Sequence, residues 1–502
     1  MHPPAVKDFP ASWNITSLLW HTCIWLLLPV FLFMTGWMHW YIGLPLTVFM
    51  AWGLGISRKT FRASRERRAS GLPFPLLTWS SLAVLAGFIL LMVISGWGEW
   101  CNQHPDHIVR NACLRELVAS PWPVAFPDGD VLIYNIGFWL VPALIGKTAG
   151  LDAARVALPL WGAWGLYLSW LWLCVFGGRR SMSTALLLVL FGSLMNLQGL
   201  LDLDLVRLHY FGITEQIMCS SNAAIPVILF FTCLTSGRLP LSWLLILFAT
   251  LAFYSPLAAL GGLPLLLCQG IVQWKKQASL HSFLRLLPAL AASLVLGICF
   301  LLYYANVNIP SSRMGFRLFY IHVTDIALIG SSFLIYAAFC WRDACRIPLF
   351  PTALATGLLL PFFYVYGDVN DLLCKGCVPV MACLLAFLSR TWEQHSKLRV
   401  WIAALLILGM APRLNLPYYC CSTDALRRAL QPQEATQQTT QNSWLNMKIQ
   451  HLTYAPQAKA QTEWGNTMYH PGHRWYPYYS GTPKPAYRFI YRTAGIPARL
   501  PR

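Results

Sequence analysis

Long apolar runs separated by short basic loops restrict this chain more than any motif does. The first run, from about Ser17 to Met38, is long enough to cross a bilayer, which takes about 20 apolar residues in a helix. It lacks a small-residue cleavage site, so we expect a membrane helix and no cleavable signal peptide. Hydrophobic residues make up 57% of the 502 residues and charged residues only 11%, against about 25% charged in a soluble domain. The sequence therefore predicts an all-α membrane protein and excludes a disordered chain.

The apolar runs predict a polytopic bundle of about thirteen transmembrane helices over residues 1–410. One further run, 131–146, is interrupted by Pro142, and as a span it would reverse the sidedness of the later basic loops. We interpret it as a helix that lies at the outer interface or dips into it. The predicted spans lie near residues 17–38, 41–56, 74–97, 153–177, 182–201, 222–236, 240–254, 256–273, 286–305, 322–341, 347–365, 376–390 and 399–411.

Basic loops set the predicted orientation. The loop Ser57–Ser70 holds six Lys and Arg residues against one acid, Glu66, and short loops this basic stay in the cytoplasm. The N-terminus is then cytoplasmic, and residues 411–502 form an external (periplasmic) tail of a bacterial inner-membrane protein. We expect the aromatic stretch Trp464–Tyr491 of this tail to pack on the membrane domain. The net charge of +18 is spread over such loops, which favours lipid headgroups over nucleic acid as the partner.

Polar residues collect in the predicted outer loops, and the longest of these is Gly98–Asp130. It contains Glu99 and Asp106, and His104 and His107 flank Asp106. Two histidines and one acid form a weak metal pattern, so a divalent cation is only an alternative here. Cys101 and Cys113 lie in the same loop and could form a disulfide in an oxidising compartment. The stretch Asn111–Val118 has helical periodicity and predicts a short amphipathic helix on the membrane surface.

Three further outer loops supply candidate ligands for a phosphate and a sugar. Arg313 and Arg317 are four residues apart, so they would share one face of a helix, and Lys375 lies at the mouth of a span; all three could bind a phosphate. For these bases, snorkelling to lipid headgroups is the competing interpretation. The candidate substrate-binding residues are Asp202, Asp204, His209, Asn370 and Asp371.

The layout resembles the membrane glycosyltransferases of the GT-C fold class, which have many spans and a large first outer loop that holds a catalytic acid. The segment Tyr134–Leu168 is similar to the interfacial helix, small-residue turn and long span that follow this loop in that class, with Gly150 at the turn and Arg155 after it. The chain also resembles uncharacterised bacterial multi-spanning proteins of the same type, through Asp106-His107, NACLREL, Trp122-Pro123 and NDLLCKGCVP.

The resemblance implies transfer of a sugar from a polyprenyl-phosphate donor to a glycan, lipid or protein acceptor outside the membrane. Asp106 would then be the general base, Glu99 is the alternative base, and His107 would orient the carboxylate. A solvated loop acid is the competing interpretation of Asp106. The other functions considered are a transporter or flippase for a lipid-linked glycan and a non-catalytic component of an envelope polysaccharide system. Few predicted spans carry an ionisable residue near the centre, which disfavours transport.

Overall fold

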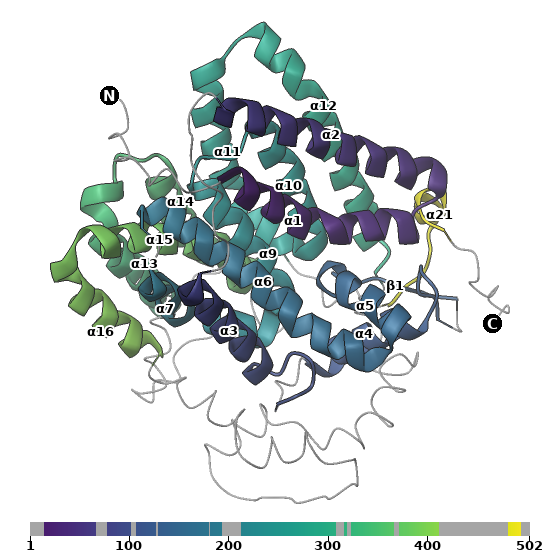
Figure 1. Cartoon of the computed structure of the whole chain (residues 1–502), viewed down its shortest axis with the longest axis horizontal. Helices are drawn as coiled ribbons and strands as arrows, with labels where there is room; N and C mark the ends of the chain where they lie inside the picture. Colours follow the sequence, from purple (N-terminus) through teal and green to yellow (C-terminus); the bar gives the residue numbers. More distant parts are fainter. Residues whose placement is uncertain are drawn as a thin grey trace, which may run out of the picture.

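The computed structural model describes residues 15–66, 78–101, 107–126, 129–179, 181–192, 212–307, 316–318, 323–365, 371–410 and 480–492. Within these ranges the chain forms a bundle of helices with two short two-stranded sheets (Figure 1). The longer helices are α1 (Ile15–Trp37), α2 (Trp40–Glu66), α3 (Trp79–Ile94), α4 (His107–Ala119), α5 (Gly137–Ala149), α6 (Leu151–Gly177), α7 (Met182–Leu190), α9 (Ile213–Thr235), α10 (Leu241–Tyr254), α11 (Pro256–Gln277), α12 (Leu280–Tyr304), α13 (Val323–Ala344), α14 (Leu349–Leu359), α15 (Asp371–Gln394) and α16 (Arg399–Met410).

Each of the thirteen predicted apolar segments overlaps one of these helices, which is consistent with the predicted all-α membrane class. Among the described residues, six helices are long and apolar enough to cross a membrane: α1, α6, α9, α11, α12 and α15. Other helices are too short to cross. Helix α7 has 9 residues and α14 has 11, and at 1.5 Å per residue neither reaches across the apolar core of a bilayer. The count of thirteen spans stays a prediction.

Helix α9 lies at the centre of the bundle. Each of its 23 residues is buried, and it packs against both α6 and α15. Glycines allow the helices to approach closely, as is common in membrane bundles. A Cβ atom on Gly165 of α6 would lie 2.6 Å from Cγ2 of Ile225, and one on Gly261 of α11 would lie 2.4 Å from the carbonyl oxygen of Gly376 in α15. Larger residues at these crossings would force the helices apart.

Apolar side chains also cover much of the outer surface of the bundle. Helix α12 exposes a row of leucines that includes Leu287, Leu294 and Leu301. Trp40 at the start of α2, Trp79 at the start of α3 and Trp401 at the start of α16 are strongly exposed. Tryptophan at helix ends is typical of a membrane interface, so this surface suits a lipid environment.

The helix ends gather in two groups. One group contains the end of α1, the start of α2, α4, α5 and the end of α12; we call it the outer end, after the predicted topology. The other contains the start of α7 and the ends of α13 and α15, where Thr184 bonds Glu393 at 3.3 Å and His395 bonds Asp343 at 2.8 Å; we call it the inner end. The predicted alternation of basic loops groups the same helix ends. Which compartment each end faces stays a prediction.

The run 131–146, predicted as an interfacial helix, is helical only in its second part, and its position at the interface stays a prediction. Its first residues form strand β1 (Val131–Leu132), and α5 begins at Gly137 and continues to Ala149 with Pro142 inside it. Helix α5 packs against α4, α6 and α1. A Cβ atom on Gly137 would lie 2.9 Å from the rings of Phe253 and Tyr254, so the helix begins where only glycine fits against α10.

Candidate functional site

A tight turn after α3 carries Glu99 into the protein. Gly96, Gly98 and Glu99 all have positive φ, and among the described residues Glu99 is the only non-glycine with that conformation, at 68°. A Cβ atom on Gly98 would lie 2.5 Å from the carbonyl oxygen of Arg155, so glycine is required where the turn meets α6. This backbone directs the Glu99 side chain between α4 and α6.

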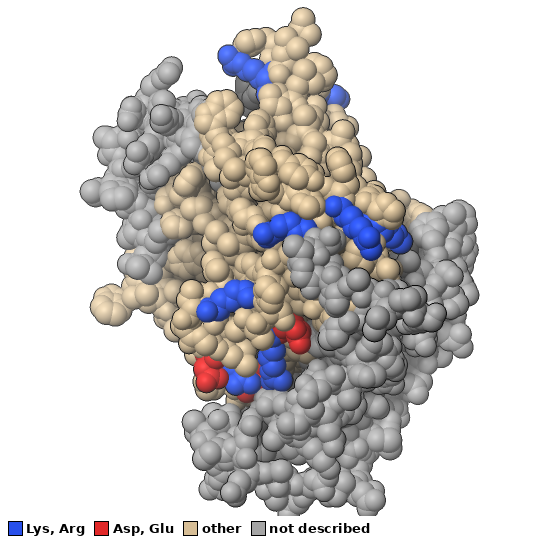
Figure 2. Space-filling view, turned by 90° about the vertical axis from the view of Figure 1, so that its right-hand side faces the viewer, with Lys and Arg blue, Asp and Glu red and all other residues tan. Residues whose placement is uncertain are grey.

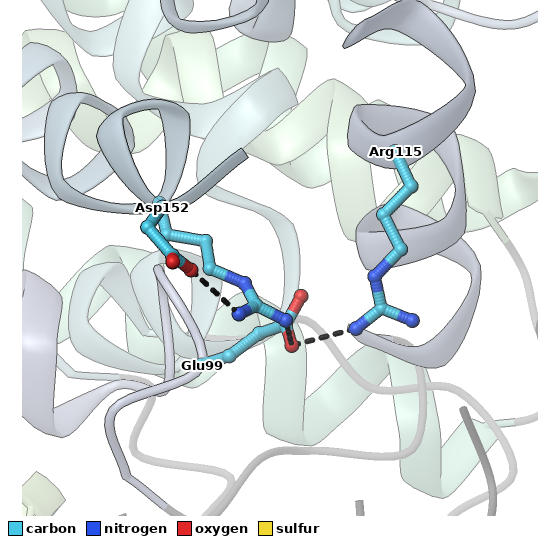
Figure 3. Close-up of polar contacts among 4 residues, drawn as sticks. Glu99, Arg115 and Asp152 are labelled. Carbon is cyan, nitrogen blue, oxygen red and sulfur yellow. Dashed lines mark hydrogen bonds and ion pairs between the residues drawn. The ribbon is translucent and has the colours of Figure 1, made fainter. Parts of the chain in front are cut away.

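Glu99 is the centre of a buried ion cluster (Figure 3). Its side chain is only 5% exposed, and its Oε2 accepts hydrogen bonds from Nη2 of Arg115 at 2.7 Å and from Nη2 of Arg155 at 2.8 Å. Nη1 of Arg155 also donates to Asp152 at 3.0 Å, but Asp152 is 90% exposed. We call these four residues the Glu99 cluster.

The Glu99 cluster bears on the predicted role of Glu99 as the alternative base. The bonds from both arginines go to Oε2, and each charge-assisted bond of this kind contributes about 1.5–3 kcal/mol. The geometry favours a link between the turn after α3, helix α4 and helix α6 over proton transfer. The sequence singled out Glu99 and Arg155 separately, and it contains no signal that the two side chains meet.

His107, the first residue of α4, is fully buried and joins α4 to α9. Its Nε2 lies 2.7 Å from the carbonyl oxygen of Met218, and its ring contacts the Trp97 ring with centroids 4.6 Å apart. A carbonyl oxygen can only accept a hydrogen bond, so Nε2 of His107 must carry a proton and act as the donor. In the neutral ring, Nδ1 is then the nitrogen that can accept a hydrogen bond. His107 therefore fixes the start of α4 in place.

These contacts coincide with a break in α9. Ser220 has non-helical angles, φ −150° and ψ 36°. The carbonyl oxygen of Ile217 accepts from Nε1 of Trp97 at 2.8 Å, and that of Met218 bonds His107. Side chains thus bind backbone carbonyls next to the break, as a buried polar backbone requires. The polar triplet Ser220-Ser221-Asn222 in an apolar run is the sequence signal for this break.

Arg110 and Lys375 both lie at the outer end, within electrostatic range of each other. Arg110 lies one turn after His107, is only 7% exposed, and has its Cζ 5.8 Å from the centre of the Trp97 ring. Lys375 pairs with Asp371 one turn earlier in α15, with Nζ to Oδ1 at 3.5 Å. Both Arg110 and Tyr134 lie within electrostatic range of Lys375. We call Arg110 and Lys375 the cation pair; of the two residues, only Lys375 is selected from the sequence.

Two connections bring the cation pair together. Helix α4 is fixed to α9 at Met218, and Nε2 of Gln216, two residues earlier in α9, donates to the carbonyl oxygen of Cys374 at 2.8 Å. Three aromatic rings pack together beside this region. The ring centroids of Trp97 and Trp139 are 6.4 Å apart, and those of Tyr134 and Trp139 are 5.6 Å apart. Elements from four parts of the sequence thereby meet at one place.

Arg317, one of the predicted phosphate ligands, lies in an extended segment of the chain. Arg317 belongs by its backbone to strand β2 (Phe316–Leu318), which pairs antiparallel with β3 (Phe363–Val365), so Arg317 faces Tyr364 in the register. The helical spacing proposed for Arg313 and Arg317 is therefore wrong at Arg317, because the chain there is extended. The predicted residues outside the described ranges are His104, Asp106, Asp202, Asp204, His209, Arg313 and Asn370.

The disulfide considered between Cys101 and Cys113 is not formed, and both are free thiols. Cys113 is fully buried in α4, and burial together with the nearby Glu116 raises the pKa of its thiol, so reactive thiolate is scarce. Within the described part of the chain, no three His, Cys, Asp or Glu side chains form a group that could hold a metal ion.

Comparison with known proteins gives no match: no family model, curated protein or solved structure matches the chain. The resemblance to the GT-C class therefore stays a matter of layout. Function has to be argued from the side chains at the outer end.

Proposed function

We propose that the chain is a membrane glycosyltransferase that uses a polyprenyl-phosphate-linked sugar donor at the outer face of the cytoplasmic membrane. The acceptor would be a glycan, a lipid or a protein. The observation that carries the proposal is the cation pair, Arg110 and Lys375. The two residues come from helices far apart in sequence and lie within electrostatic range of each other at one end of an apolar bundle.

Like charges repel strongly where water is scarce, and a bound anion relieves that repulsion. Asp371 pairs with Lys375 at 3.5 Å, so the Lys375 ammonium group is held near the start of α15. The start of α15 adds the partial positive charge of a helix N-terminus, which favours a phosphate. A lipid phosphate matches this site, because its chain can stay in the bilayer while its headgroup binds the cations.

The catalytic carboxylate in this proposal is Asp106. It directly precedes His107 in the sequence, and His107 is fixed to α9 through Met218. A base that removes the proton of an acceptor hydroxyl contributes about 10²–10⁴-fold to the rate. Glu99 takes the role of a structural link instead, because its carboxylate is bound by Arg115 and Arg155.

A flippase for a lipid-linked glycan is the second candidate, and the break in α9 at Ser220 favours it. Discontinuous helices form substrate sites in many transporters. Against this, the carbonyl oxygens of Ile217 and Met218 near the break bind Trp97 and His107. Bonds to fixed, buried side chains suit a structural break better than a transport path, so we place the enzyme first.

Binding of a short polyprenyl phosphate tests the proposal. We would measure the affinity of the purified chain in detergent for farnesyl phosphate, with uncharged farnesol as the reference ligand. Arg110→Met and Lys375→Met should each weaken farnesyl phosphate binding about 10- to 100-fold, the loss of one charge-assisted contact. Arg285→Met is the matched control, since Arg285 is exposed on α12 and should have no effect. Equal affinity of wild type and both variants, or no preference for the phosphate over farnesol, would contradict the proposal.

A further inference from the structure

Residues 480–492 lie against the outer end of the bundle, at the right of Figure 1 in yellow, and we call them the C-terminal strap. The strap contains β4 (Ser480–Gly481) and α21 (Pro485–Ile490). Strand β4 pairs antiparallel with β1, with Gly481 opposite Val131, and Gly481 also bridges to Val307 after α12. This confirms that the described part of the aromatic tail packs on the membrane domain.

Gly481 is the closest contact of the strap. A Cβ atom there would lie 2.4 Å from the carbonyl oxygen of Asn306 and 2.6 Å from Cγ1 of Ile133. Backbone atoms cannot move aside as a flexible side chain can, so any larger residue would push the strap away from β1 and α12. Glycine at this position is required by the contact itself.

Side chains then join the strap to the loops on both sides of it. Oγ1 of Thr482 donates to Oδ1 of Asp130 at 2.9 Å, immediately before β1. The backbone N–H of Lys484 donates to Oδ1 of Asn306 at 2.9 Å. Because Asp130 ends the long outer loop 98–130, the strap holds the base of the loop that carries Glu99 and Asp106.

The strap also closes over the turn between α1 and α2. The N–H of Arg492 donates to the carbonyl oxygen of Trp37 at 2.7 Å, and the N–H of His39 donates to that of Ile490 at 3.0 Å. The hydroxyl of Tyr491 donates to the carbonyl oxygen of Cys299 in α12 at 2.5 Å. Burial raises the pKa of the Tyr491 hydroxyl, so this donor stays protonated. The bonds to the α1–α2 turn connect segments about 450 residues apart in the sequence, and the bond to Cys299 connects segments 192 residues apart.

Two basic side chains of the strap bind the ends of helices. The Arg492 guanidinium donates to the carbonyl oxygens of Thr35, at 2.9 Å, and Gly36 at the end of α1. Nζ of Lys484 donates to the carbonyl oxygen of Ala305, directly after α12, at 2.7 Å. Cations at helix C-termini satisfy carbonyls that have no partner within the helix and complement the helix dipole. Figure 2 shows the side of the molecule that lies at the right of Figure 1, where Lys and Arg side chains are spread over the visible surface.

We propose that the C-terminal strap locks the outer end of the bundle and holds β1, and with it the base of loop 98–130, in the position seen here. Its contacts with β1, with the α1–α2 turn and with the end of α12 make these three elements depend on one another. This proposal rests on the contacts alone and stands whether or not the chain is a glycosyltransferase.

Hydrogen exchange of the full-length chain in detergent tests the strap. Gly481→Val should detach it, so that amides of residues 124–136 and 35–41 exchange at least 10-fold faster, while the core helices α9 and α15 keep their protection. Phe489→Ala is the control, since Phe489 is exposed on α21 and should leave exchange unchanged. The proposal is overturned if the strap itself exchanges freely in Gly481→Val while residues 124–136 stay as protected as in the wild type.

A milder variant covers the case in which Gly481→Val does not fold. Thr482→Val removes the bond to Asp130 and keeps the shape of the side chain, so it should speed exchange around Asp130 and β1. Asp130→Ala combined with Thr482→Val should change exchange by less than the sum of the two single changes, because each single change removes the same hydrogen bond. Full additivity of the two changes, or unchanged exchange at β1 in Thr482→Val, would equally overturn the proposal.

Discussion

Glu99 and Arg155 are 56 residues apart and form a 2.8 Å ion pair that joins the turn after α3 to the first turns of α6. Arg115 adds a second bond to the same carboxylate oxygen from α4. One buried acid thus fixes three elements at the outer end. Because Arg110 lies on α4, the Glu99 cluster also holds the helix that carries one member of the cation pair.

We expect the Glu99 cluster to contribute to the stability of the fold and not to the chemical step. Glu99→Gln removes the buried counterion of Arg115 and Arg155 and leaves Arg155 only the exposed Asp152, so we expect a loss of about 2–4 kcal/mol in the free energy of unfolding. Asp152→Asn is the control, because an exposed ion pair contributes about 0–1 kcal/mol. Thermal unfolding in detergent measures both. A normally stable Glu99→Gln protein that has lost sugar transfer would instead make Glu99 the base.

His107 should be needed for its hydrogen bond more than for its ring. His107→Phe keeps the aromatic contact with Trp97 but leaves the Met218 carbonyl oxygen without this donor, at a cost of about 1–3 kcal/mol. His107→Gln can still donate and should recover part of the loss. Chemical denaturation of the three proteins measures the difference. Equal stability of His107→Phe and wild type would show that the bond to α9 contributes nothing.

The grouping of helix ends predicts the sidedness of the chain. A reporter that is active only outside the cytoplasm should be active when inserted after Gly129 or fused after Arg502, and inactive when inserted between His395 and Ser396. Gly129 adjoins Asp130, to which the strap is bonded, so the first two sites must agree with each other. Opposite signals from Gly129 and Arg502 would contradict the topology and the strap together.

Local patterns predict the helices well, because each apolar run or amphipathic stretch is readable on its own. The amphipathic pattern of Asn111–Val118 predicts α4, although the helix begins four residues earlier, at His107. The break at Ser220 and the beginning of α5 at Gly137 depend on neighbours, Trp97 and Phe253 among them, that hydrophobic periodicity does not identify.

Contacts between distant segments are what the sequence cannot predict. Nothing near Gly481 indicates that it pairs with Val131 and Val307, because a two-residue strand has no recognisable pattern. The cation pair is similar: Lys375 is recognisable at the mouth of a span, but its neighbour Arg110 follows from the way α4 is fixed to α9. The sequence therefore predicts which types of residue form the candidate site, but it does not predict which of them lie close together.

Sugar transfer by membrane vesicles that contain the chain tests the central claim most directly. A panel of radiolabelled polyprenyl-phosphate sugars would be offered together with acceptors native to the host membrane. We expect the wild type to transfer label from one donor, and Asp106→Asn, inserted at normal levels, to lose about 10²–10⁴-fold in rate. Lys375→Met should lose transfer through weaker donor binding. No transfer from any donor, or wild-type rates in both variants, would contradict the proposed function.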